Sequence, residues 1–216
     1  MKKTFAIGDI HGCLEKLDDL ITKINPGQGD LIIFLGDYID RSANPKSVVD
    51  FLIEFSANVE CIFLRGNHED MFLEFLEFGT SKTMFFANGG LKTIDSYVYP
   101  EPFSSRVQVA HALPETHRDF YAGLKWCYED ERYIYVHAGI KPDVAMHLQD
   151  RRDLIWIRDE FIFSPTGLEK KVIFGHTPFA RHFLRPDKIG VDTGAVYGGC
   201  LTAVQLPEEV FIQSYR

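Results

Sequence analysis

The sequence predicts an α/β domain, and three features of the chain support that class. Short apolar runs followed by turn-forming residues recur along its length, as expected of buried strands. Segments with helical spacing of apolar residues separate the first three runs, which implies parallel strands joined by crossover helices. At 216 residues, with 45% hydrophobic and 13% aromatic side chains, the chain can bury a substantial core.

The expected strands are the apolar runs themselves. They cover residues 4–9, 30–37, 59–67, 132–139, 171–176, 201–206 and 210–215. The later runs follow shorter connections than the first three, so we expect that some of them pair antiparallel.

The expected helices follow from apolar stripes at a spacing of three and four residues. Two stripes lie between the first strands, one made by Leu14, Leu17, Leu20 and Ile21 and one by Val48, Val49, Leu52 and Phe55. A third helix is expected over residues 68–79, ended by Gly79, and a short one over 114–124, begun by Pro114. Pro, Ser and Glu interrupt any periodicity over 98–113, which we interpret as a loop or lid.

Composition and charge exclude several classes of protein. The formal charge is −8, from 31 acidic and 23 basic residues, so a broad surface for nucleic acid is not expected. The first apolar stretch stops at Asp9, too early for a signal peptide, and no run approaches the ~18 apolar residues of a membrane span. We expect one domain over 1–216, located in the cytoplasm, with neither nucleic acid nor membrane as partner.

Polar motifs follow five of the expected strands. They read GDIHG at 8–12, GDYIDR at 36–41, GNHE at 66–69, HAG at 137–139 and GH at 175–176. Alone, the first could be a turn with a capping Asp, and a buried His such as His137 or His176 is more often a hydrogen-bonded core residue. Because the carboxyl ends of parallel strands face one crevice, the ordered set instead predicts one shared site.

The residue types in these motifs indicate a metal site. The candidate ligands are Asp9, His11, Asp37, Asn67, His137 and His176. Carboxylate, amide oxygen and imidazole without thiolate suit Mn, Fe, Co or Zn. Six ligands suit two metals, roughly 3.5 to 4 Å apart and bridged by a carboxylate and a water, an arrangement that supports phosphoester hydrolysis. Asp37, in the central motif, is the expected bridge.

The ordered motifs resemble those of the metal-dependent phosphoprotein phosphatases, in particular the short bacterial and phage-type members of this calcineurin-like metallophosphoesterase group. The resemblance extends over residues 8–176. It implies an α/β fold in four layers, with two mixed β-sheets packed as a sandwich and flanked by helices. It also implies a centre of two divalent ions at one edge, with Mn²⁺ the first candidate and Fe, Zn or Co the alternatives.

The resemblance also implies a role for each motif residue. Asp9, His11 and Asp37 would hold one metal, and Asp37, Asn67, His137 and His176 the other. The expected reaction is hydrolysis of phosphoserine or phosphothreonine in proteins by a hydroxide bridging the two metals. In that reaction His68 would protonate the leaving group, Asp40 would pair with His68, and Arg41 would bind phosphate.

Two further arginines are candidate phosphate ligands. Arg65 precedes the GNHE motif and could instead be a structural counterion beside so many acids. Arg158 stands in a Trp-x-Arg segment that resembles one in bacterial members between the HAG and GH motifs, although it could simply pair with Asp159 or Glu160 at the surface.

The substrate class has two enzymatic interpretations. A closely similar branch hydrolyses diadenosine tetraphosphate symmetrically and typically reads GDLVARGP and LGNHD, whereas this chain carries Asp40, Arg65 and Glu69 at the differing positions. Those residues favour a phosphoprotein or phosphopeptide over a dinucleoside polyphosphate. A third interpretation, a catalytically inactive binding scaffold, fits poorly, because every expected ligand position is filled.

Overall fold

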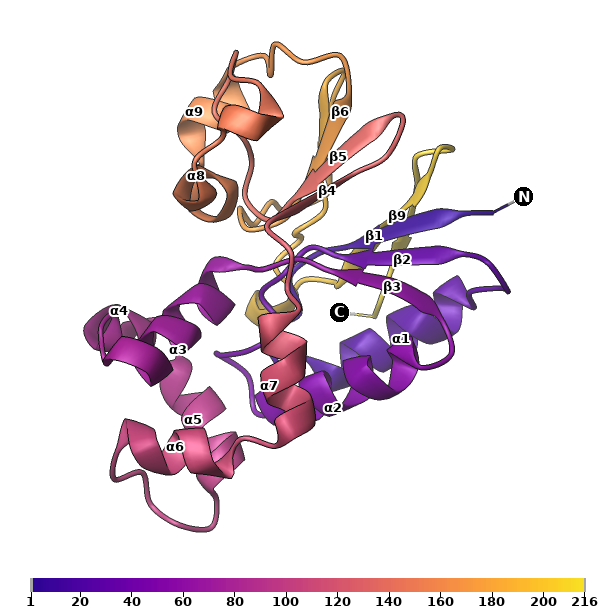
Figure 1. The fold of residues 1–216 in the computed structure, drawn as a ribbon. Helices are drawn as coiled ribbons and strands as arrows, with labels where there is room; N and C mark the ends of the chain where they lie inside the picture. The colour runs from indigo at the N-terminus through magenta and orange to yellow at the C-terminus, as the bar shows by residue number, and fades with distance from the viewer. Residues whose placement is uncertain (1, 216) are drawn as a thin grey trace.

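The computed structural model describes residues 2–215 and contains two five-stranded sheets (Figure 1). The first sheet has the order β10-β9-β1-β2-β3, with β1 Thr4–Ile7, β2 Leu31–Phe34, β3 Glu60–Phe63, β9 Thr202–Leu206 and β10 Val210–Gln213. The second has the order β4-β5-β6-β8-β7, with β4 Cys127–Glu129, β5 Tyr133–Val136, β6 Lys171–Phe174, β7 Phe183–Arg185 and β8 Lys188–Gly190. A shared layer of buried side chains, including Ile33 of β2 and Ile173 of β6, joins the two sheets into a sandwich.

Strand pairing in the first sheet follows the predicted pattern. β1, β2 and β3 are parallel, while β9 and β10 pair antiparallel. In the second sheet β5, β6 and β8 are parallel and only the edge strands β4 and β7 are antiparallel. The sequence did not reveal β4, β7 and β8, because runs of three residues are too short to show a strand period.

Helices cover both outer faces of the sandwich. The described helices are α1 Leu14–Ile24, α2 Pro45–Ser56, α3 Asn67–Phe78, α4 Lys82–Ala87, α5 Gly90–Val98, α6 Arg106–Ala112, α7 Glu115–Ala122, α8 Arg151–Trp156 and α9 Asp159–Phe163. Leu17 of α1 and Leu52 of α2 pack with Phe34 on the first sheet, and Phe161 of α9 packs with Phe174 on the second. The structure therefore confirms the four-layer α/β sandwich.

Two helical groups flank the strand ends that carry the motifs. Helices α3–α6 and the pair α8–α9 lie on the side of the sheets toward which β1 runs from the N terminus (Figure 1). The prediction of a loop or lid over 98–113 is wrong for residues 106–112, which form α6. The side chain of Ser105 accepts a hydrogen bond from Gln108 N, and Val109 is buried, so a cap and one core contact are enough to fix this short helix.

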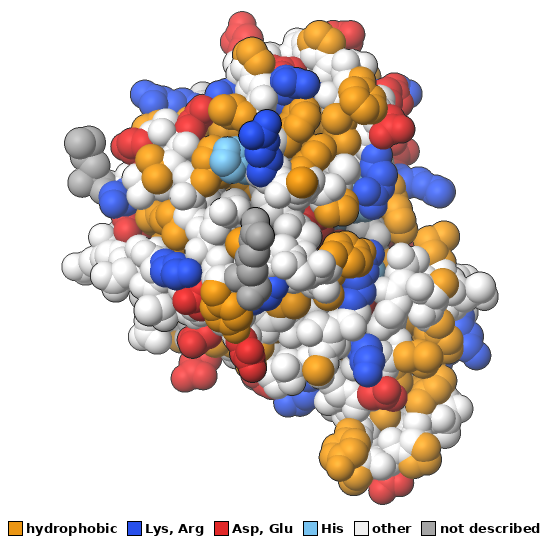
Figure 2. Space-filling view, turned by 180° about the vertical axis from the view of Figure 1, so that it is seen from behind, with side chains coloured by type: hydrophobic (Ala, Val, Ile, Leu, Met, Phe, Trp, Pro, Cys, Tyr) orange, Lys and Arg blue, Asp and Glu red, His pale blue; other side chains and the backbone are white. Residues whose placement is uncertain are grey.

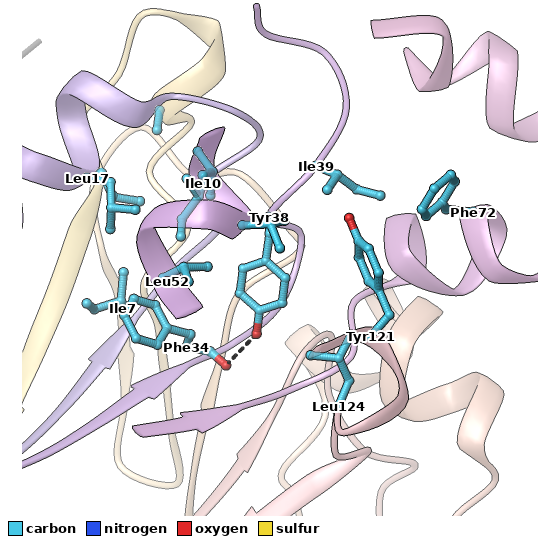
Figure 3. Close-up of a cluster of buried hydrophobic side chains, with 14 of the residues drawn as sticks. Ile7, Ile10, Leu17, Phe34, Tyr38, Ile39, Leu52, Phe72, Tyr121 and Leu124 are labelled. Atoms are coloured by element: carbon cyan, nitrogen blue, oxygen red, sulfur yellow. Dashed lines mark hydrogen bonds between the residues drawn. The ribbon is translucent and has the colours of Figure 1, made fainter. Parts of the chain in front are cut away.

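Tyr38 fixes the loop that follows β2. Its hydroxyl lies 2.7 Å from the carbonyl oxygen of Leu64 and 3.2 Å from that of Phe34, while its ring is buried among apolar side chains (Figure 3). The loop is therefore tied to the carboxyl ends of both β2 and β3, and its neighbours Asp37 and Asp40 are held beside the adjacent strand-end loops.

The surface carries charges of both signs. On the face seen in Figure 2, Lys and Arg side chains are interspersed with Asp and Glu. Among residues 2–215, none of the helices combines the length and the apolar character needed to cross a bilayer.

Candidate metal centre

The loops after β1 and β2 are bonded directly to each other. The backbone N–H groups of Ile10 and His11 donate to Asp37 O at 3.0 and 2.8 Å, and Gly12 N donates to Tyr38 O at 2.9 Å. Left-handed φ angles occur at the non-glycine residues His11, Asp37, Asp40, Arg41 and His176. Such conformations are sparsely populated outside glycine and concentrate at functional sites, so the surrounding fold must impose them.

Asp37 lies between two groups of potential ligand atoms. His11, Asp37 and His68 form the first donor group, and Asp37, His137 and His176 form the second, each with one donor atom per residue within 4.8 Å of the others. Oδ2 of Asp37 lies 3.4 Å from His11 Nε2, while its Oδ1 lies 3.4 Å from His137 Nε2. The carboxylate thus faces both groups, as expected of a bridging ligand.

The second donor group includes the amide of Asn67. His137 Nε2 lies 3.0 Å from Asn67 Oδ1 and 3.2 Å from His176 Nδ1. With Asp37, these residues come from four different strand-end loops and lie close together, and they are the four that the resemblance assigns to one metal.

Asp9 is placed differently from the other candidates. Its two carboxylate oxygens accept the backbone N–H of His176 at 3.0 and 3.1 Å, and it belongs to neither donor group. It is buried, and its charge contributes to the raised pKa of Asp37, so it still lies close to the centre.

The histidine tautomers fit metal binding. Carbonyl oxygens only accept hydrogen bonds, so His11 Nδ1 donates to Ile39 O at 2.8 Å and His137 Nδ1 donates to Leu35 O at 2.9 Å. Each neutral ring then presents an unprotonated Nε2 to the centre, which is the form that binds a cation. In particular, His137 Nε2 and Asn67 Oδ1 are two acceptors only 3.0 Å apart, a contact that a cation would make favourable.

The pKa values of the buried acids and histidines also indicate that a cation can bind at the centre. Burial, and then the neighbouring carboxylates, raise the pKa of Asp9 and Asp37 well above the usual range. Burial also lowers the pKa of His11 and His176 well below the usual value, which keeps the imidazoles neutral. A cation favours ionised carboxylates and neutral imidazoles together, so the donor set fits divalent metal ions.

His68, a member of the first donor group, also forms a buried pair with Asp40. His68 Nδ1 lies 2.6 Å from Asp40 Oδ2, and both side chains are fully buried. Burial raises the pKa of Asp40 to about 8 and lowers the pKa of His68 well below the usual value. Nε2 of His68 faces the centre, 3.9 Å from Asp37 Oδ2.

The three predicted arginines differ in position. Arg41 is half-buried and donates from its two terminal nitrogens to His11 Nε2 and His68 Nε2, both at 2.9 Å. Burial lowers the pKa of His68 and His176, and the positive charges of Arg41 and Arg158 lower both pKa values further, which indicates that Arg158 lies near the centre. Arg65 Nε instead lies 3.1 Å from Asp70 Oδ1, and its guanidinium stacks 4.7 Å from the Trp126 ring, as expected of a structural counterion.

Glu69 organises the central loop, a role that the motif reading missed. Its buried carboxylate accepts the backbone N–H groups of Asp37 at 2.9 Å, Tyr38 at 2.8 Å and Gly66 at 3.0 Å. Burial raises the pKa of Glu69 to about 7, and the three hydrogen bonds oppose that rise. The spacing of Gly66 and Glu69 at the start of α3 is that of a capping box, a signal that could have identified this contact.

Asp192 is a second acidic residue that the sequence reading missed. It follows β8, is buried, and accepts the N–H of Gly194 at 2.9 Å. Its charge raises the pKa of Asp9, and burial raises its own pKa to about 6. The sequence GVDTG at 190–194 resembles the other strand ends, where an aspartate follows apolar residues. The preceding strand β8 has only three residues, too few to show a strand period in the sequence.

Comparisons with known proteins place these features in a family. Residues 2–197 match the family model of the calcineurin-like phosphoesterases. Two curated relatives align with almost the whole chain. The bis(5'-nucleosyl)-tetraphosphatase PrpE [asymmetrical] of Halalkalibacterium halodurans is 24% identical, with 95% of this chain and 91% of the relative covered. Serine/threonine-protein phosphatase 1 of Salmonella typhimurium is 28% identical, with 95% and 92% covered.

A solved structure supports the fold independently. The structure of a protein serine/threonine phosphatase from Saccharomyces cerevisiae with similarity to human phosphatase PP5 superimposes with a TM-score of 0.68. Its sequence is 14% identical, and the match covers 100% of this chain and 80% of that one. The sandwich, the converging strand-end donors and the family match together lead to one conclusion: this chain belongs to the calcineurin-like phosphoesterase family.

Proposed function

We propose that this protein hydrolyses phosphate monoesters, with phosphoserine and phosphothreonine in proteins as the substrate class. The observation that carries the proposal is the buried pair of His68 and Asp40. A serine or threonine alkoxide is a poor leaving group and needs a proton as its bond to phosphorus breaks. Because Asp40 accepts from Nδ1, Nε2 is the nitrogen of His68 that would deliver this proton.

We assign the metal ligands as the resemblance to the phosphatases implies. Asp9, His11 and Asp37 would hold one divalent ion, and Asp37, Asn67, His137 and His176 the other. When bound, two such ions supply Lewis-acid activation of water and neutralise phosphate charge, and the mixture of oxygen and nitrogen ligands favours Mn²⁺. Asp37 belongs to both donor groups, which supports its role as the shared ligand.

Substrate phosphate would be bound by Arg41 and Arg158. The guanidinium of Arg41 already reaches the Nε2 atoms of two histidines, so a phosphate oxygen at the centre would accept the same donors. Transfer of Arg41 to phosphate would also free Nε2 of His68 to carry a proton. Arg65, paired with Asp70, is expected to stabilise the start of α3 instead.

Metal removal tests the proposed centre directly. We expect a chelator to abolish phosphatase activity and Mn²⁺ to restore it more fully than Ca²⁺, which prefers sites made of oxygen alone. The measurement is hydrolysis of an aryl phosphate by protein dialysed against chelator and then supplied with each ion. Full activity in protein shown by elemental analysis to be metal-free would contradict the proposal.

Asymmetrical hydrolysis of dinucleoside tetraphosphates is the second candidate. The tetraphosphatase of H. halodurans and a homologue from Oceanobacillus iheyensis, 26% identical, each align over 91% of their own length. In that reaction the leaving group is itself a phosphate, which departs without protonation by an acid such as His68.

Substrate preference in the wild type and in Asp40→Ala distinguishes the two candidates. We expect kcat/KM for a phosphoserine peptide to exceed that for diadenosine tetraphosphate with the same Mn²⁺ concentration. Asp40→Ala should reduce the difference between the two kcat/KM values by lowering mainly the value for the peptide, because the substitution removes the partner that stabilises protonated His68. A strong preference of the wild type for the dinucleotide would instead make the second candidate the function.

A further inference from the structure

Asp40 and Arg41 hold an unusual backbone conformation at the edge of the centre. Both are non-glycine residues, and their φ angles are 70° and 69°. Left-handed conformations are unfavourable for non-glycine residues, and two in succession persist only if contacts from elsewhere impose them. The contacts that do so come from the helices inserted between β3 and β4.

The turn between α4 and α5 packs against this strained segment. Gly89 O accepts the backbone N–H of Arg41 at 3.5 Å, a long bond. A Cβ atom at Gly89 would lie 2.9 Å from Arg41 N and 3.0 Å from Arg41 Cα, and the φ of Gly89 is itself +95°. Only glycine allows the two backbones to approach this closely.

Thr93, on the first turn of α5, contacts Asp40 twice. Its Oγ1 accepts the backbone N–H of Asp40 at 3.0 Å and donates its own proton to Asp40 Oδ1 in a short hydrogen bond. Both residues are 0% exposed, so water does not substitute for either contact. One hydroxyl therefore fixes both the backbone and the carboxylate of Asp40, and it leaves Oδ2 to His68.

Contacts of Tyr97, one helical turn after Thr93, hold helix α5 against α7. Tyr97 lies four residues after Thr93, and its hydroxyl is 2.8 Å from His117 Nδ1 and 3.1 Å from the hydroxyl of Tyr121, both on α7. Phe72 of α3 packs against the ring of Tyr121, and Ile39 lies close to both (Figure 3). The position of Thr93 is thus set by the packed helical group.

We propose that Thr93 is a positioning residue for the leaving-group acid, acting through Asp40 on His68. The proposal rests on the proposed function, because it assumes that His68 protonates the leaving group. Thr93 would select the carboxylate rotamer in which Oδ2 meets Nδ1, so that Nε2 is aimed at the leaving oxygen. Loss of its hydroxyl would allow Asp40 to rotate, and His68 would lose the partner that orients it.

Removal of the Thr93 hydroxyl tests this role. Thr93→Val has nearly the same shape without the hydroxyl, and we expect kcat on a phosphoserine peptide to fall by ~10- to 100-fold, the loss expected for a hydrogen bond to a charged group. KM and metal content should stay near the wild-type values. On an aryl phosphate, whose leaving group needs no proton, the loss should be at most a few-fold. Thr93→Ser retains the hydroxyl and should restore most of the peptide activity.

Two controls keep the test decisive. Thr93→Ala removes the hydroxyl without crowding Asp40, so it reports the same selectivity if the valine variant folds poorly. Thr166→Val removes a different buried threonine hydroxyl, which only accepts from Leu168 N at 3.3 Å, and it should leave both activities unchanged. Equal losses on the two substrates, or failure of Thr93→Ser to rescue, would overturn the role of Thr93.

His68→Asn in the same assays separates this inference from the proposed function. If His68→Asn loses mainly the peptide reaction while the Thr93 variants lose both reactions equally, the positioning role is wrong and the acid role stands. If His68→Asn also loses both reactions equally, the acid role fails and the role of Thr93 fails with it.

Discussion

Asp37→Asn is expected to cause the largest loss of any single ligand substitution. Its two carboxylate oxygens face different donor groups, so one change weakens both proposed metal sites. We expect the metal content to fall from near two ions per chain to below one. The value of kcat/KM should fall by at least ~10³-fold, because each bound ion is worth several kcal/mol to the transition state.

The measurement combines elemental analysis of the purified variant with steady-state kinetics on an aryl phosphate. Asp18→Asn is the matched control, because Asp18 is an exposed aspartate on α1 and its loss changes the net charge by the same amount. Retention of two ions and normal activity in Asp37→Asn would show that Asp37 is not a bridging ligand.

His68→Asn is expected to have the second-largest effect, and the effect should depend on the leaving group. Rate on a phosphoserine peptide should fall by ~10²- to 10⁴-fold, the range of general acid catalysis, while metal content stays near that of the wild type. Hydrolysis of p-nitrophenyl phosphate should fall much less, because nitrophenolate leaves without a proton. The ratio of the two losses is the quantity to measure.

An alternative outcome would change the role of His68. Its Nε2 belongs to the first donor group, so a role as ligand predicts loss of metal and equal losses on both substrates. His147→Asn, at an exposed histidine outside the centre, should leave metal content and both rates unchanged.

Local sequence signals predicted an α/β domain with a shared site at its strand ends, and the resemblance to the phosphatases added the two-sheet sandwich. Five of the seven expected strands end in motifs with Asp, His or Asn, and parallel pairing brings those ends together, so Asp37, Asn67, His137 and His176 converge as expected. Asp192 was not predicted as a site residue. The strand before it, β8, spans only Lys188–Gly190 and is too short to show a strand period.

Contacts made across long stretches of chain could not be predicted. Thr93 lies 53 residues from Asp40 along the chain, and nothing near Thr93 in sequence indicates a bond to a buried carboxylate. The contacts of Arg65 also could not be predicted from its position in the sequence. Its position beside a motif made it a candidate phosphate ligand or a structural counterion, and in the structure Asp70 and the indole of Trp126 contact its guanidinium.

The arrangement of the two helical groups has a consequence for how such an enzyme can change. The proposed metal ligands all project from strand ends, whereas Thr93 and Arg158 come from segments inserted between strands. Insertions of this kind can be lengthened, shortened or replaced while the sheets keep their hydrogen bonds. If the proposed roles hold, the metal ligands and the acid pair are encoded at the strand ends, whereas the residues that support the acid and bind phosphate, Thr93 and Arg158, are encoded in insertions, so selection could alter the second set without rebuilding the first.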